Sequence, residues 1–243
     1  MATFVQTNVG LYWGGYSLAS TFNAIALSTA AAAVDDTVYG DTTVSHAAGL
    51  STVSLEGEGY WSPTEDAALF SGISINASDT VVTVTPYNQS AGSRAIFSNL
   101  AVSEYSPVSG TVGDMAGFKL SGESRGDKAV SGEILVAAGG DNRTSSSTSA
   151  VNASIGAVSA SQKIYSALHV LSASGTLVVT VKSASNLAFS ADVTTELTHT
   201  SVGSSVTAEL LSKAGAIANA FWRVDFTISG GGSFDFIVSL AVK

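Results

Sequence analysis

The chain has 243 residues, only 12% of them charged, and it contains no cysteine. This length suits one large β domain or two small ones with a proper core. The lack of cysteine excludes disulfides and cysteine-ligated metal sites. So few charges are unusual for a free monomer and favour a subunit whose faces are covered by neighbours.

The net charge of −9 is unevenly distributed along the chain. No Lys or Arg precedes Arg94, whereas eight acids do: Asp35, Asp36, Asp41, Glu56, Glu58, Glu65, Asp66 and Asp79. An acidic N-terminal part repels phosphate backbones, which argues against a nucleic-acid-binding module of the basic-patch kind.

Residues 1–34 carry no charge. Ala30–Ala33 resembles a signal-peptide cleavage site, but the basic n-region is missing and polar residues interrupt each apolar run. The segment is also too polar to span a bilayer. We therefore expect no targeting segment and no transmembrane helix, and a soluble product that folds in the cytoplasm where it is made.

The N-terminal region is predicted to begin with a strand pair, Gly10–Leu18 and Phe22–Ser28, with turns at Gly14-Gly15 and residues 20–21. The alanine run Thr29–Val34 is predicted to form one helical turn. Asp35–Gly49 is polar and rich in turn residues, so we expect a long loop, and such loops are usually functional or assembly elements. The candidate assembly residues in it are Asp35, Asp36, Thr37, Tyr39, Asp41 and His46.

The segment Leu50–Trp61 alternates with period two and is predicted to be a strand. One face carries Thr52, Ser54, Glu56 and Glu58, and the other carries Val53, Leu55, Gly57, Gly59 and Trp61. Two carboxylates on one face are too costly to bury unpaired, so that face must meet water. We interpret it as a channel-lining or assembly surface. A glycosidase pair is the alternative, since residues two apart on one strand face lie about 7 Å apart.

Ser62-Pro63-Thr64-Glu65-Asp66 has the pattern of a helix start, with Ser62 as N-cap, and the helix is expected to reach about Ser71. Further strands are predicted at 80–85, 95–105, 117–123, 129–137, 164–171, 176–182, 193–202, 220–229 and 233–242. The last two are expected to form a hairpin, because Gly230-Gly231-Gly232 supplies the positive φ angles of a tight turn. Gly139–Ser149 is small and polar, which is typical of a linker.

Catalytic and metal-binding motifs are missing from the sequence. His46, His169 and His199 stand alone, without an HExxH pattern, and His169 is predicted to be a core or sheet histidine with satisfied hydrogen bonds. No GxSxG elbow occurs. Arg125-Gly126-Asp127 is an adhesion-type tripeptide, but turn chemistry at a hairpin tip explains it. We expect no enzyme activity, no catalytic residues, no cofactor and no metal.

Several short motifs resemble major tail tube proteins of long-tailed bacteriophages. In the first half they are Tyr16-Ser17-Leu18-Ala19-Ser20, Val34-Asp35-Asp36-Thr37, Tyr39-Gly40-Asp41 and Gly49-Leu50-Ser51 leading into Val53-Ser54-Leu55-Glu56-Gly57. The second half resembles the C-terminal β domain of larger members, in Gly175-Thr176, Phe189 with Asp192-Val193-Thr194, and Trp222-Arg223-Val224.

This resemblance implies a mostly-β fold, a β-sandwich or barrel-forming tail-tube-like domain with one short flanking helix, followed by a second β-sandwich domain. The expected boundaries are 1–138 for the tube-like domain, 139–149 for the linker and 150–243 for the second domain, which decorates the tube or completes its wall. Subunits stack as rings around a channel lined by an inner barrel, and Thr52, Ser54, Glu56 and Glu58 are expected to face that lumen. The implied location is the virion tail, with synthesis in the host cytoplasm.

The implied partners are the protein itself, other tail proteins, and DNA that passes through the lumen without specific binding; no membrane partner is expected. Two alternatives remain open. One is a capsid decoration or fibre protein, which would form small oligomers and no tubes. The other is a carbohydrate-binding β-sandwich, which would show exposed aromatics in polar loops, whereas most aromatics here fall within predicted strands.

Overall fold

The computed structural model describes residues 8–40, 42–63, 66, 69–70, 79–111, 113–124, 129–139, 142–149 and 151–243. Strands are by far the main regular structure of the described residues, which confirms the predicted mostly-β class. Its contacts separate it into unit 1 (residues 1–20, 80–98 and 130–243) and unit 2 (residues 21–79 and 99–129). No helix among the described residues is long and apolar enough to cross a bilayer.

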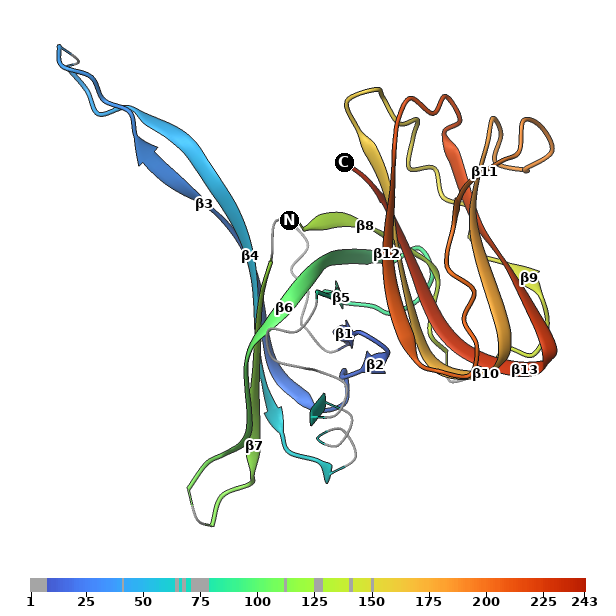
Figure 1. Cartoon of the computed structure of the whole chain (residues 1–243), viewed down its shortest axis with the longest axis horizontal. Helices are drawn as coiled ribbons and strands as arrows, with labels where there is room; N and C mark the ends of the chain where they lie inside the picture. The colour runs from blue at the N-terminus through green and yellow to red at the C-terminus, as the bar shows by residue number, and fades with distance from the viewer. Residues whose placement is uncertain are drawn as a thin grey trace. The chain divides into compact units, whose positions relative to one another are not determined.

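Unit 2 is built on a four-stranded antiparallel sheet (Figure 1). Its order is β3 (Phe22–Asp35), β4 (His46–Tyr60), β7 (Gly117–Ser124) and the C-terminal part of β6 (Arg94–Ser109). β7 pairs with β4 only from Ser54 to Tyr60. The earlier part of β4 therefore pairs with β3 alone among the described residues, and the two strands continue as a two-stranded ribbon.

The burial of β4 follows the predicted alternation. Val53 and Leu55 are buried, whereas Glu56 and Glu58 are exposed. The glycines on the buried face make room for neighbours: a Cβ on Gly57 would lie 2.0 Å from Cε1 of Phe22. Aromatic rings thus fill the space that β4 leaves open, which explains why glycine alternates with glutamate there.

The predicted helix start is present. Pro63, Asp66, Leu69 and Phe70 are helical, and the N–H of Asp66 donates to the carbonyl of Ser62 at 2.9 Å. Leu69 is buried, which anchors the helix on unit 2. Residue 67 and the expected helix end at Ser71 lie outside the described residues.

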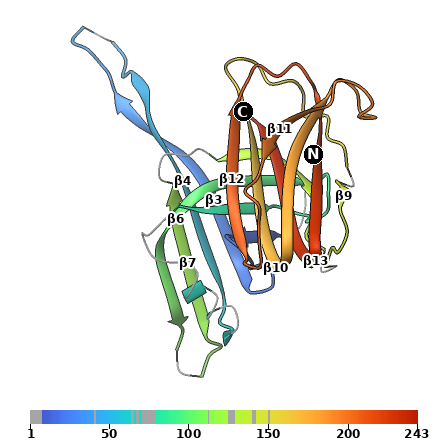
Figure 2. The ribbon, with the colours of Figure 1, turned by 45° about the vertical axis from the view of Figure 1, so that its right-hand side comes forward.

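Unit 1 is organised around two long strands, β10 (Lys163–Ala184) and β13 (Phe221–Val242). They pair antiparallel from Ile164↔Val242 to Ala184↔Phe221, with register shifts near the middle. Figures 1 and 2 show this pair bending back on itself, so that its two halves form two facing layers. Side chains from both halves share one core, including Leu168, Val170, Leu177, Val179, Val224 and Phe236.

The hairpin predicted at Gly230-Gly231-Gly232 is wrong. These glycines lie inside the continuous strand β13, and Gly230 and Gly231 have φ angles of 74° and 65°. They bend the strand at the level of Gly175 of β10, whose φ is 93°. A Cβ on Gly175 would lie 2.6 Å from Cα of Gly232, so the bend needs glycine on both strands. The strands predicted at 164–171 and 176–182 are likewise one strand.

Shorter strands complete unit 1: β1 (Gly10–Trp13), β2 (Tyr16–Ser17), β5 (Thr80–Thr85), β8 (Val130–Val136), β9 (Ser147–Thr148), β11 (Thr194–Thr198) and β12 (Thr207–Ala214). β12 pairs with the first half of β10, and β11 pairs with the second half. The two short strands therefore belong to different layers of unit 1. A second core cluster, with Tyr12, Phe97, Ile134 and Ile237, covers the other face of the first half. β12 is not among the strands predicted from the sequence.

Three further local predictions fail. Thr29–Val34 is strand, not a helical turn, because Thr29 and Ala30 pair with Val53 and Thr52. The first strands do not pair with each other: β1 pairs with β2 and β5, and β3 pairs with β4. The loop is shorter than Asp35–Gly49, since β3 ends at Asp35 and β4 begins at His46.

The predicted domain division at 139–149 differs from the two contact-defined units. In the described part of that segment, Arg143 forms a bridge with Phe234, and Ser147-Thr148 pairs with β13. Whether the free subunit is cut first within 139–149 by proteases stays a prediction.

Candidate channel-lining face and assembly arm

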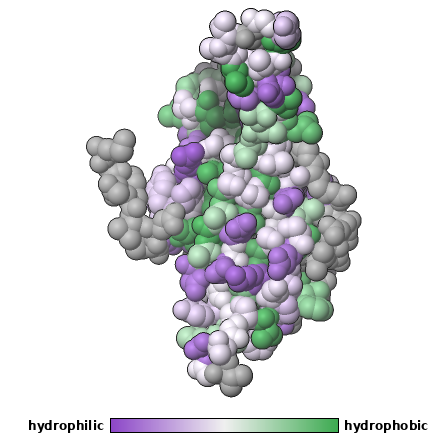
Figure 3. All heavy atoms as spheres, turned by 90° about the vertical axis from the view of Figure 1, so that its left-hand side faces the viewer, coloured by the Kyte–Doolittle hydropathy of each residue, from purple (hydrophilic) through white to green (hydrophobic). Residues whose placement is uncertain are grey.

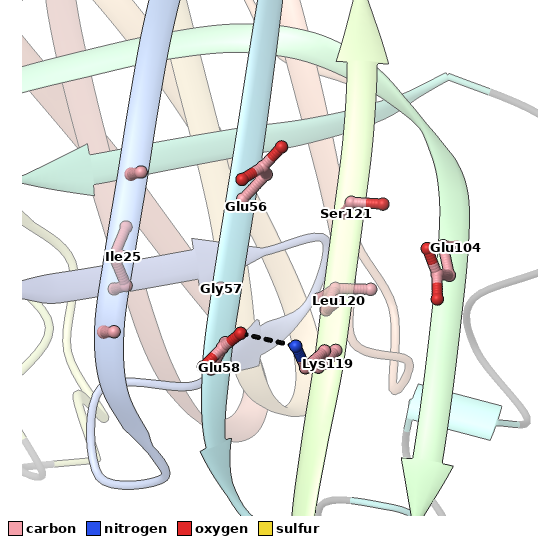
Figure 4. Close-up of a pocket in the computed structure, with 10 residues that line it drawn as sticks. Ile25, Glu56, Gly57, Glu58, Glu104, Lys119, Leu120 and Ser121 are labelled. Carbon is pink, nitrogen blue, oxygen red and sulfur yellow. Dashed lines mark ion pairs between the residues drawn. The ribbon is translucent and has the colours of Figure 1, made fainter. Parts of the chain in front are cut away.

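The exposed face of the unit 2 sheet is made of rows that cross all four strands. One row runs Ala26, Glu56, Ser121 and Glu104. The next runs Ala24, Glu58, Lys119 and Ser106. Each residue of a row faces its neighbour directly across the sheet, so their side chains project from the same face (Figure 4). All four predicted lumen-facing residues, Thr52, Ser54, Glu56 and Glu58, belong to this face.

Charge on this face is predominantly negative. Among the residues that the structure describes, it carries the four acids Glu56, Glu58, Glu104 and Glu123 and one base, Lys119, a net of −3. Nζ of Lys119 lies 2.8 Å from Oε1 of Glu58, and both side chains are more than half exposed. The hydrogen bond and charge of Glu58 raise the pKa of Lys119, and Glu104 and Glu56 add to the effect. Such an exposed pair adds little stability and mainly shapes the surface charge.

The rest of the face consists largely of small side chains, with Ala24 and Ala26 on β3 and serines on the other strands. Oγ of Ser28 lies 2.8 Å from Oγ of Ser54, and Oγ of Ser103 lies 2.9 Å from Oγ of Ser121. These hydroxyl pairs hydrogen-bond to each other across neighbouring strands. In the space-filling view of Figure 3, the described residues on this side of the molecule are mostly white to purple, and green apolar residues lie between them.

The glycosidase alternative finds no support in this geometry. A glycosidase holds its two carboxyl groups on either side of the scissile bond, in surroundings that separate their pKa values. Glu56 and Glu58 instead project side by side from one strand of an exposed sheet face, and Glu58 is paired with Lys119.

The predicted assembly loop closes the ribbon of β3 and β4. The side-chain oxygen of Asp35 accepts a hydrogen bond from the N–H of Thr37 at 2.9 Å, and hydrogen bonding to Thr37 lowers the pKa of Asp35. Oγ1 of Thr37 in turn accepts from the N–H of Ser45 at 3.0 Å. Asp35, Asp36, Thr37, Tyr39 and His46 are all exposed, and Asp41 lies outside the described residues. The expected loop is thus the tip of the two-stranded ribbon formed by β3 and β4, which is called the arm below.

The histidines of unit 1 have structural roles. His169 is buried, as predicted; its Nε2 lies 2.7 Å from Oγ1 of Thr83 and its Nδ1 lies 2.7 Å from the carbonyl oxygen of Gly14. Burial lowers the pKa of His169 to about 4. The ring therefore stays neutral at physiological pH and links β10 to β5 and to the turn after β1.

His199 joins Ser166 and Glu209 in a chain with the connectivity of a catalytic triad. Its Nε2 lies 2.9 Å from Oγ of Ser166, and its Nδ1 lies 2.8 Å from Oε2 of Glu209. The hydrogen bond to His199 lowers the pKa of Glu209 to about 2. Ser166 is fully buried and faces the core between the two layers, so no substrate reaches its hydroxyl. These hydrogen bonds connect β12 to the segment after β11, so the role of the three residues is structural.

Several residues of the polar face were not predicted from the sequence. Lys119, Ser121 and Glu123 alternate along Gly117–Ser124, so their common face was readable from the sequence. Their position opposite Glu58, Glu56 and Ser54 was not, because strand register is a long-range property. Among the described residues, no cluster of three or more His, Asp or Glu is arranged to hold a metal ion. Arg125-Gly126-Asp127 lies outside the described residues.

The solved structures described here are only weakly similar to this chain. No protein-family model matches the chain, and no curated protein sequence matches it. A chain from the virion of a native gene transfer agent particle is 14% identical over 52% of this chain and 97% of its own, with a TM-score of 0.39. A sheath/tube terminator of an extracellular contractile injection system is 15% identical over 54% and 97%, with a TM-score of 0.42.

The SPP1 Dit protein, described as a paradigm of the hub adsorption apparatus of phages that infect Gram-positive bacteria, aligns over 97% of this chain and 99% of its own. Its identity is 7% and its TM-score 0.37. TM-scores below 0.5 at such identities establish neither a common fold nor a common function. The function therefore has to rest on the residues of this chain.

Proposed function

We propose that the protein is a structural subunit of a virion tail that polymerises as stacked rings into the tail tube. The observation that carries the proposal is the unit 2 sheet: one face packs on a core, and the other is an exposed, polar, acidic surface. The resemblance of the sequence motifs to major tail tube proteins points the same way. The protein acts by assembly, without catalysis.

The two edge strands of the unit 2 sheet, β3 and β6, favour ring closure. β3 has β4 as its only strand partner among the described residues, and its 14 residues contain neither Lys nor Pro. Natural proteins usually protect such edges with these residues, or abolish the edges by closing the sheet into a barrel. β6 lies at the other side of the unit 2 sheet and runs antiparallel to β3. Joining β6 of one copy to β3 of the next therefore continues the antiparallel order around a ring.

Ring closure would turn the polar face into the wall of a channel. Three net negative charges per subunit become a band of one sign, and such bands produce fields larger than those of single residues. DNA is repelled over a distance of about 8 Å at physiological salt. Repulsion centres the duplex without binding it, which suits transit. The partners are other copies, other tail proteins and DNA in passage, and the second β domain (150–243) decorates the tube or completes its wall.

The edge of β3 offers a direct test. The N–H of Val53 donates to Oγ of Ser124, on the β7 side of β4. The pair Thr29↔Val53 is therefore not hydrogen-bonded between β3 and β4, and the N–H of Thr29 points outward from the sheet. Thr29→Pro removes this outward donor while leaving the β3–β4 hydrogen bonds in place; Thr29→Ala is the matched control that keeps it.

We expect wild type and T29A to form rings in sedimentation velocity and negative-stain electron microscopy, and T29P to stay a folded monomer. A decoration or fibre protein would give small oligomers that are insensitive to T29P. If T29P forms rings as readily as wild type, the edge of β3 is not part of the interface between subunits.

A further inference from the structure

The arm formed by β3 and β4 exposes large apolar side chains that the subunit does not cover. Val34, Val38, Tyr39, Val44 and Leu50 are between 51% and fully exposed. Ala30, Ala31 and Ala33 on the same ribbon are exposed as well. A two-stranded ribbon is marginally stable in water without packing. The arm therefore needs a surface to lie on, and that surface is apolar.

A second exposed apolar cluster lies at the opposite end of the same sheet. It is called the end patch here and consists of Tyr60, Trp61, Phe70, Val108 and Met115, with exposures of 38% to 76%. Strand pairing brings these segments together, because Tyr60 pairs with Gly117, which also pairs with Ser109. The N–H of Trp61 donates to the carbonyl of Ala116 at 2.9 Å, and the Phe70 ring lies 6.2 Å from that of Tyr105.

The two clusters are separated by the length of β4. The arm leaves the four-stranded sheet next to Val53, where the pairing of β7 with β4 ends. Its β4 strand continues away from the sheet to His46, and His46 and Tyr60 are about 45 Å apart along β4 at the usual rise of a strand. The arm therefore cannot fold back onto the end patch of its own sheet while β4 keeps its pairing with β7. A second copy displaced along the strand direction presents its end patch where the first copy presents its arm.

We propose that the arm of one copy docks on the end patch of another copy in a head-to-tail contact. Apolar surface is removed from water on both sides, and a contact between two different patches of identical chains propagates as a ring or an open stack. The inference rests on the proposed function, because it assumes assembly, and it adds which two surfaces meet between stacked copies.

The absence of cysteine makes a cross-linking test clean. Tyr39→Cys places a thiol at the arm tip and Met115→Cys places one in the end patch, both at exposed positions. The double variant and each single variant are assembled, treated with a short bis-maleimide, and separated on a denaturing gel. Leu187→Cys, an exposed position in unit 1, combined with Tyr39→Cys is the control pair.

We expect a ladder of covalent multimers, several-fold above background, only from Y39C with M115C. Dimers from Y39C alone would show an arm-to-arm contact and overturn the proposal. Tubes in the microscope without the ladder would overturn it while leaving the proposed function standing. If wild type and T29A both stay monomeric under all conditions, both the head-to-tail contact and the proposed function are wrong.

Discussion

Nζ of Lys119 on β7 lies 2.8 Å from Oε1 of Glu58 on β4, and this pair crosses the exposed face of the unit 2 sheet. It neutralises one of four carboxylates, so the face stays acidic while one strand-to-strand contact is charge-assisted. The pair also supplies a control for charge variants, because exchanging its two partners keeps the net charge of the face.

Charge reversal on this face should change DNA passage and leave assembly intact. Glu56→Lys with Glu58→Lys turns the proposed net charge from −3 to +1 per subunit, and neither side chain is buried. Tubes should form, but DNA delivery should slow in a salt-dependent way, because a cationic wall binds phosphates. Delivery is measured as DNA ejected from particles over time.

The matched control for that experiment exchanges the partners of the ion pair. Glu58→Lys with Lys119→Glu keeps the net charge and the pairing. This control should eject DNA at the wild-type rate. Normal ejection by the double Lys variant would mean that Glu56 and Glu58 do not face the lumen.

Gly59→Ala should destabilise unit 2. A Cβ at this position would lie 2.2 Å from the backbone carbonyl oxygen of Thr21, and a backbone atom cannot move aside as a side-chain end can. Overpacking of this kind typically costs about 1–3 kcal/mol. Urea denaturation measures the loss. Gly203→Ala, where nothing lies within 4 Å, is the control and should change stability little; an equal effect at both positions would contradict the packing described for β4.

Acid should weaken unit 1 through His169. The folded-state pKa of about 4 lies below the ordinary value of 6.5, so the unfolded chain binds the proton more readily. The stability contributed by the neutral ring is present above pH 6.5 and is lost as the pH falls from 6.5 towards 4 and below, by up to about 3 kcal/mol. Urea midpoints at pH 7 and pH 4.5 report the loss. His169→Gln should show a smaller drop over the same interval; an identical drop would assign the acid sensitivity to other groups.

Shortening the arm tip should separate folding from assembly. Removing about five residues between Asp36 and Ser45 leaves the pairing of β4 with β7 untouched, so the protein should fold. It should no longer polymerise, as judged by sedimentation and electron microscopy. Polymerisation at the wild-type concentration would show that the tip has no part in the contacts.

The sequence predicts what depends on local patterns. The alternation from Thr52 to Glu58 was enough to assign both faces of β4, because period-two patterns reflect burial directly. Ser62 and Pro63 marked the helix start, because the preferences for the N-cap and the first helical position are also local. His169 was recognised as a core residue because it stands between apolar neighbours in Ala-Leu-His-Val-Leu.

What depends on distant contacts was not predictable. The alanines at 30–33 favour a helix in isolation, but pairing with β4 overrides that propensity. Gly230-Gly231-Gly232 has the composition of a hairpin turn, yet β10 pairs along the full length of β13, so the glycines bend a strand instead of reversing it. The pairing of Lys119 with Glu58 depends on register between strands that are about sixty residues apart in sequence.

Cryo-electron microscopy of the assembled protein tests the central claim most directly. The account predicts stacked rings in which β3 of one copy pairs with β6 of the next, and in which Glu56, Glu58, Glu104 and Glu123 line the channel. Rings whose channel is lined by another surface, with these carboxylates on the outside, would contradict it, as would a protein that remains a monomer at high concentration.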